Sequence, residues 1–185
     1  WPVRTWGNLT ERALHQAKKL QRTANNSGGR LTLVQTQNQL TDVLRRREEG
    51  DNTIAAILGI EGAHALERDL TQLERLYNAG FRSVGLTHFF DNEVGGSAHG
   101  LDKGGLTAFG MKVVTRMEEI GMAIDLAHAS PSLINDILGT ASQPVLISHT
   151  GVKGTCDNER NVGDEALRGV AVTGGLVGIG LWPEA

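Results

Sequence analysis

The sequence is poor in several features that would narrow its class. A single cysteine, Cys156, excludes an internal disulfide. No apolar run approaches the ~18 residues needed to span a membrane, and no signal peptide is recognisable. The formal net charge is −3, and the absence of a basic excess argues against a nucleic-acid surface. We therefore expect neither a nucleic-acid partner nor a membrane segment in this chain.

Apolar residues make up 39% of the 185 residues, which is enough for one domain with a core, placed at residues 1–185. The basic run of Arg45, Arg46 and Arg47 is interpreted as the solvated end of a helix rather than as a binding surface. The chain begins at Trp1 rather than at Met, which suggests a processed or excised piece of a longer protein.

Hydrophobic periodicity predicts six short strands, and a helix follows each of them except the last. The predicted strands are residues 31–34, 53–60, 83–87, 122–127, 144–148 and 176–181. The predicted helices are residues 10–23, 41–49, 66–77, 107–120, 131–138 and 164–171. Repeating strand–helix units indicate an α/β fold with a parallel sheet, and their near-equal spacing favours a (β/α)8 TIM-type barrel. Such a barrel needs eight strands, so six indicate a partial one.

Four of the predicted strands end in a side chain that can bind a metal. These residues are Glu61, His88, His128 and His149. A single histidine at a strand end is more often a hydrogen-bonded structural residue. Four ionisable groups at one rim are better explained by a catalytic or metal-binding site, because parallel barrels place their active sites at the C-terminal ends of the strands. The glycine-rich connection 88–106 lies at the same end, where long loops cover a site.

Glutamate together with two histidines is typical of hydrolytic zinc sites. Zinc lowers the pKa of a bound water to about 7 and polarises the carbonyl that the water attacks. By ligand type, zinc is favoured over magnesium at this rim.

Six motifs, in order, resemble those of the membrane (renal-type) dipeptidases, the M19 metallopeptidases of the amidohydrolase superfamily. They are residues 60–64 (IEGAH), 86–88 (LTH), 105–110 (GLTAFG), 124–130 (IDLAHAS), 147–149 (ISH) and 160–162 (RNV). The resemblance runs from about residue 31 to the C-terminus, and the long loop is similar to that of bacterial members. It implies a zinc-dependent dipeptidase that hydrolyses the peptide bond of a dipeptide by means of a metal-activated water.

The resemblance also implies roles for individual residues. Glu61 matches the glutamate that bridges two zinc ions, and His128 and His149 match the two histidines of the second ion. His88 and Arg160 match the histidine and arginine that contact the substrate. Those two are therefore the expected catalytic residues, with Arg160 holding the C-terminal carboxylate.

The sequence departs from the family pattern at both ends. The family's first strand contains a His-x-Asp pair for the first zinc, and this sequence has no His-x-Asp. Its last strand contains an aspartate that would lie beyond Ala185. The chain therefore resembles strands two to seven, with one complete zinc site where a complete enzyme has two. We expect at most one tightly held zinc and little peptidase activity from this chain alone, and association through open strand edges, for example as a homodimer.

Other residues have less specific interpretations. His64 fits a capping or ligand-supporting role, His99 a solvent-facing position, and Asp125 a buried position with a partner such as an arginine. Two alternative functions stay open: another amidohydrolase-type hydrolase acting on an amide or lactone, and an inactive zinc-binding fragment. The sequence leaves the location open between bacterial cytoplasm and an exported or periplasmic site.

Overall fold

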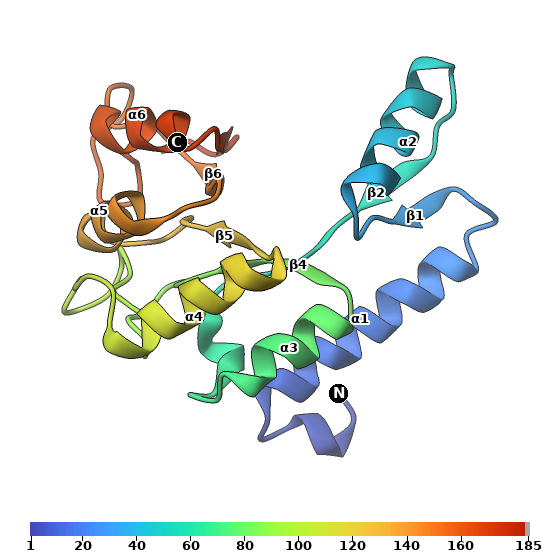
Figure 1. Cartoon of the computed structure of the whole chain (residues 1–185), viewed down its shortest axis with the longest axis horizontal. Helices are drawn as coiled ribbons and strands as arrows, with labels where there is room; N and C mark the ends of the chain where they lie inside the picture. Colours follow the sequence, from blue (N-terminus) through green and yellow to red (C-terminus); the bar gives the residue numbers. More distant parts are fainter. Residues whose placement is uncertain (184–185) are drawn as a thin grey trace.

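The computed structural model describes residues 1–183, in which strands and helices alternate along most of the chain (Figure 1). The strands are β1 (Leu31–Leu33), β2 (Ile54–Ala56), β3 (Leu58–Ile60), β4 (Phe81–Gly85), β5 (Ala123–Asp125), β6 (Leu146–Thr150) and β7 (Leu176–Ile179). The α-helices are α1 (Leu9–Asn25), α2 (Gln37–Glu48), α3 (Thr71–Asn78), α4 (Ala108–Ile120), α5 (Pro131–Thr140) and α6 (Asp164–Val172). Two short 3-10 helices, η1 (Val3–Thr5) and η2 (Ala63–Leu66), complete the elements.

Strands β3 to β7 form one parallel sheet whose spatial order follows the sequence order. Within it Val84 pairs with Ile60 on one side and with Ile124 on the other. Strands β1 and β2 form a separate parallel pair, which stands with α2 at the opposite end of the molecule from α5 and α6 (Figure 1). Sequential parallel strands joined by helices place all C-terminal strand ends at one rim.

Helices α4 and α5 begin where local signals predict, whereas α2 begins at Gln37, four residues before the predicted helix 41–49, because Thr36 and Gln39 form a capping box. Thr107 caps α4 by accepting a hydrogen bond from the Gly110 amide, and Gly121 ends it in the left-handed region at φ 71°. Ser130 caps α5 in the same way, with Pro131 at the first helical position. These two caps fix the points at which the chain enters α4 and α5.

The predicted strand 53–60 is wrong as a single element. Its first part, β2, pairs with β1, whereas its second part, β3, pairs with β4. Ile57 lies between the two parts with 53% of its surface exposed. Apolar periodicity reports burial but not the pairing partner, so a chain that passes from one sheet to the next gives the same pattern as one continuous strand.

The predicted helix 66–77 is also wrong at its start. The segment begins as η2, and Glu67 and Arg68 then adopt positive φ values of 50° and 62°, which stop a right-handed helix. Only α3 remains helical, and it buries Leu73 and Leu76. The apolar spacing that predicted a longer helix arises because both segments face the same core.

The core lies between the five-stranded sheet and the helices packed on it. Its members include Val84, Ile124 and Ile147 from the sheet and Leu76, Met117 and Leu133 from α3, α4 and α5. Among the described residues, no helix combines the length and apolar character needed to cross a membrane.

Truncation of the core residue Leu133 tests this packing. Leu133 has no exposed surface, so Leu133→Ala should lower the free energy of unfolding by about 2–5 kcal/mol. Leu101 is 99% exposed and serves as the control, because Leu101→Ala should change stability by about 0.5 kcal/mol or less. Urea unfolding followed by circular dichroism measures both, and equal effects would contradict the described core.

Candidate metal centre

Three side chains from three strand ends converge at the rim of the sheet. Glu61 directly follows β3, His128 follows β5, and His149 lies in β6. Glu61 Oε1 lies 3.0 Å from His128 Nε2 and 3.1 Å from His149 Nε2. The two imidazole Nε2 atoms are 3.0 Å apart. One ligand atom from each residue thus contributes to a compact triangle.

The donor set of this triangle fits a cation. Ligand atoms about 2.0–2.1 Å from a tetrahedral zinc are about 3.3 Å apart, close to the separations within the triangle. A carboxylate oxygen and two imidazole nitrogens would repel one another through their lone pairs unless a proton or a cation lay between them. Glu61, His128 and His149 are therefore the residues that could hold a metal ion.

His128 reaches this position through an unusual backbone conformation. Its φ is 64°, in the left-handed region that residues other than glycine seldom adopt. The amide of Ala129 donates to the carbonyl of Leu126 across the turn, and the carbonyl of His128 accepts from the amide of Ala98 at 2.8 Å. The surrounding backbone thus holds the ligand in a conformation that costs about 1–3 kcal/mol, a feature often found at functional sites.

The electrostatic environment keeps His128 uncharged. Burial lowers the pKa of His128 to about 3, and the positive charge of Arg160 acts in the same direction. A neutral imidazole has a free lone pair on one nitrogen, which is the form that binds a metal.

His88 lies beside the triangle, after the end of β4. Its Nε2 is 3.6 Å from Glu61 Oε1, and its ring meets the His128 ring edge-on, with centroids 4.6 Å apart. The side chain is one-third exposed, so part of it is accessible to a bound molecule.

Arg160 approaches the same rim from the connection between β6 and α6. Its Nη2 donates to the carbonyl of His149 at 2.6 Å, and its Nη1 donates to the hydroxyl of Thr150 at 3.3 Å. Burial lowers the pKa of Arg160, while the negative charges of Glu61 and Asp125 oppose that effect. The guanidinium is thus fixed next to a metal-ligand candidate and is partly desolvated.

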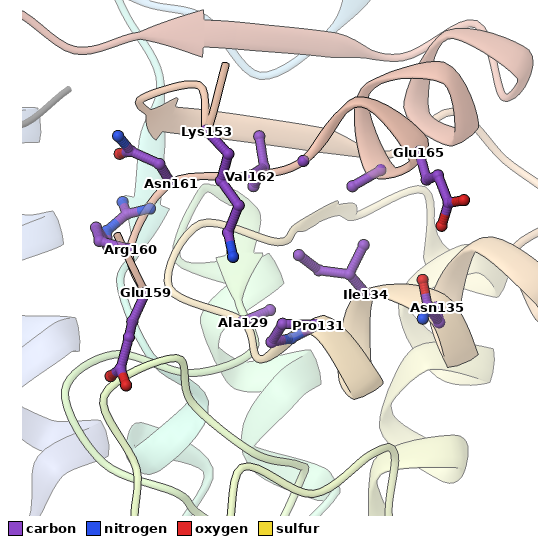
Figure 2. Close-up of a pocket in the computed structure, with 12 residues that line it drawn as sticks. Ala129, Pro131, Ile134, Asn135, Lys153, Glu159, Arg160, Asn161, Val162 and Glu165 are labelled. Carbon is purple, nitrogen blue, oxygen red and sulfur yellow. The ribbon is translucent and has the colours of Figure 1, made fainter. Parts of the chain in front are cut away.

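Arg160 also lines a cavity of about 180 Å³ between its own loop and the first turns of α5 and α6. Figure 2 shows Lys153 extending into this space above Ala129 and Pro131. The three metal-ligand candidates and His88 do not belong to the lining, so the cavity lies beside the metal centre and not within it.

Asp125 is buried as expected, but its partners differ from the expectation. The carboxylate accepts hydrogen bonds from the amides of Ala127 at 3.0 Å and Ser148 at 2.9 Å, in place of the expected arginine. Two backbone amides can satisfy a buried carboxylate as well as a side chain can. Asp125 therefore ties the ends of β5 and β6 together beneath the two histidines.

Sequence reasoning missed two aromatic rings at this site. Phe89 lies with its centroid 5.6 Å from the His128 ring, and Trp182 lies 6.2 Å from the His149 ring. His99 is exposed, as expected, but its ring also lies 5.6 Å from that of His128. Phe89 follows His88 directly in the sequence, and that adjacency was the only signal for it.

Loss of the Glu61 carboxylate tests the metal centre. We expect at most one tightly held zinc per chain, and Glu61→Gln should lower zinc affinity at least tenfold because a neutral amide is a weaker ligand. Glu159→Gln, which changes an exposed carboxylate paired with Lys103, is the matched control. Competition with a chromogenic chelator measures the affinity. Two equivalents of zinc in the unmodified protein would mean that further ligands exist.

The lowered pKa of His128 predicts a pH-dependent stability of the metal-free protein. Between pH 6.5 and about 3, the unfolded chain binds a proton at this position that the folded chain does not, so stability falls as the pH is lowered. The loss between pH 7 and pH 5 should be at most about 2 kcal/mol. His128→Asn, chosen because Asn tolerates positive φ, should reduce this loss. Unfolding in urea with chelator present gives both curves, and parallel curves would refute the assignment.

Comparison with known proteins assigns this sequence to a family. The profile of the membrane dipeptidase family (peptidase family M19) matches residues 3–185. Dipeptidase 3 of Rattus norvegicus is 37% identical over 140 residues, covering 67% of this chain and 27% of that protein. An uncharacterized dipeptidase of Schizosaccharomyces pombe is 34% identical over 135 residues, covering 71% of this chain and 32% of that protein.

A solved structure supports the fold. The metallo peptidase from Rhodobacter sphaeroides, liganded with a phosphinate mimic of the dipeptide L-Ala-D-Ala, superposes with a TM-score of 0.76 at 24% identity. The match covers 90% of this chain and 48% of that one, so the chain spans about half of that structure and a smaller part of the curated relatives. The predicted partial TIM-type barrel is confirmed. The chain belongs to the membrane dipeptidase family, peptidase family M19.

Proposed function

We propose that this chain forms the metal-binding and substrate-binding part of a zinc-dependent dipeptidase. The observation that supports it best is the approach of Glu61, His128 and His149 within 3.0–3.1 Å at one rim. A zinc ion held there would supply an activated water and polarise the scissile carbonyl. Family membership favours a peptide bond over another amide or a lactone as the target.

His88 is suited to bind the carbonyl oxygen of the scissile bond. It lies next to Glu61 but outside the triangle of ligand atoms, and part of its ring is exposed. An imidazole N–H placed there can donate to the oxygen as negative charge develops on it, an interaction that is stronger in the transition state than in the ground state.

Arg160 is suited to bind the free C-terminal carboxylate of a dipeptide. Its hydrogen bonds to His149 and Thr150 use one N–H each, and a guanidinium has five. Further donors can engage a carboxylate in a bidentate arrangement, and partial burial strengthens the pairing. Because Arg160 is anchored to the backbone of a metal-ligand candidate, the carboxylate would be held at a fixed distance from the metal centre.

The size of the chain bears on its activity. The chain spans about half of the related structure, and its sequence lacks the His-x-Asp pair expected for the other zinc. We therefore propose that turnover requires polypeptide supplying the first and last barrel strands, which would complete the second zinc site.

Substitution of Arg160 tests the proposed function. With zinc and the two additional strands supplied, the protein should hydrolyse free dipeptides, and chelator should abolish the activity. Arg160→Ala should lower kcat/KM by about 30–1,000-fold, because a charge-assisted hydrogen bond worth about 2–4 kcal/mol is lost. Arg168→Ala removes an exposed arginine of α6 and should leave kcat/KM unchanged.

The chemistry of the substrate's C-terminus provides a second arm of this test. Dipeptide amides lack the carboxylate and should be poor substrates of the unmodified protein. Equal turnover of free and amidated dipeptides would show that Arg160 has another role. Hydrolysis that persists in chelator would overturn the proposed metal dependence.

A further inference from the structure

Two rings on the long connection between β4 and α4 lie over the metal centre. The centroid of Phe89 is 4.2 Å from that of His88 and 5.6 Å from that of His128. His99, further along the same connection, has its ring 5.4 Å from Phe89 and 5.6 Å from His128. The planes of Phe89 and His99 are tilted by 54°, so the pair forms an angled wall, hereafter the Phe89–His99 wall.

The hydrogen bonds of the loop hold this wall in place. The Asp91 carboxylate accepts from the amides of Ser97 and Asp102, both at 2.8 Å. The Ser97 hydroxyl donates to the carbonyl of His88 and accepts from the amide of His99 at 3.1 Å. The backbone of His88, which directly precedes Phe89, and that of His99 are thus linked through one buried serine.

The same loop is fastened to the segment that contains His128. The amide of Ala98 donates to the carbonyl of His128 at 2.8 Å, and the amide of Ser130 donates to the carbonyl of Gly96 at 2.9 Å. The backbone of the loop that carries the wall is therefore held in position relative to the backbone of His128. A rigid ring at a fixed distance from the reacting centre can select among side chains, because little entropy is lost when the ligand binds.

The chemistry of the wall is aromatic and not ionic. Phe89 is 51% exposed, so a large apolar surface faces solvent in the free protein. Partial desolvation and the positive charge of Arg160 lower the pKa of His99, which favours the uncharged ring. The nearby charges of Lys103 and Glu159 pair with each other at 2.7 Å. The features that remain for recognition are the faces and edges of two rings, which favour an aromatic partner.

We propose that the Phe89–His99 wall binds an aromatic side chain on the C-terminal residue of a dipeptide. The inference rests on the proposed function, in which His88 contacts the scissile carbonyl and Arg160 contacts the terminal carboxylate. The C-terminal residue would then lie between His88 and Arg160. The ion pair of Lys103 and Glu159, 2.7 Å apart, joins the loop that carries the wall to the residue directly before Arg160, so these two segments lie side by side.

The test measures binding of three phosphinate dipeptide mimics to the zinc-loaded protein by isothermal titration calorimetry. The mimics correspond to Ala-Ala, Ala-Phe and Phe-Ala. The Ala-Phe mimic should bind about 2–10-fold more tightly than the Ala-Ala mimic, as expected for an added aromatic contact. Phe89→Ala should remove this preference. Phe90→Ala, which truncates a neighbouring phenylalanine that is 70% exposed, should retain it.

His99→Ala is the second variant and should weaken the same preference, with zinc content and thermal unfolding recorded for every variant. Equal binding of Ala-Ala and Ala-Phe mimics by the unmodified protein would overturn the inference and leave the proposed function standing. A preference that survives both Phe89→Ala and His99→Ala would overturn it as well, as would a Phe89-dependent preference for the Phe-Ala mimic. If no mimic binds the zinc-loaded protein, the proposed function fails, and the inference fails with it.

Discussion

The close approach of three electron-pair donors is the constraint on which the site depends. Glu61, His128 and His149 bring one oxygen and two nitrogens within 3.0–3.1 Å of one another. Such an arrangement is unfavourable for the protein alone and favourable around a cation, which is typical of a functional site. The parallel sheet makes it possible, because strand order places residues distant in sequence at one rim.

The support beneath and above the triangle is built from backbone hydrogen bonds. Below it, the Asp125 carboxylate joins the amides of Ala127 and Ser148, which precede the two histidines. Above it, the loop centred on Ser97 joins the carbonyl of His88 to the His128 segment. The backbone positions of His88, His128 and His149 are therefore supported by groups that are not themselves candidates for binding a metal or a substrate. Preorganisation of this kind lowers the free-energy cost of binding.

Much of the architecture could be predicted from local sequence. Thr107 and Ser130 predict the starts of α4 and α5, and both cap as expected. The apolar runs that end near His128 and His149 predict buried parallel strands, because strands covered on both faces have no polar alternation. Strand ends share one rim in such a sheet, so the grouping of Glu61, His88, His128 and His149 was foreseeable from sequence, whereas the choice of three of them as metal ligands came from the family resemblance.

The tertiary structure decided what depends on contacts between distant segments. The break at Ile57 depends on which sheet each half of the segment joins, and apolar periodicity does not encode a pairing partner. The left-handed conformation of His128 is accompanied by a hydrogen bond from a partner distant in the sequence, the amide of Ala98 at 2.8 Å, and neither could be predicted from the local sequence. The approach of Phe89 and His99 likewise follows from the folding of the loop around Asp91 and Ser97. The sequence determined which chemical groups the site contains and which strands carry them. The distances between these groups were decided by the folded loops, because they depend on contacts between segments that are distant in the sequence.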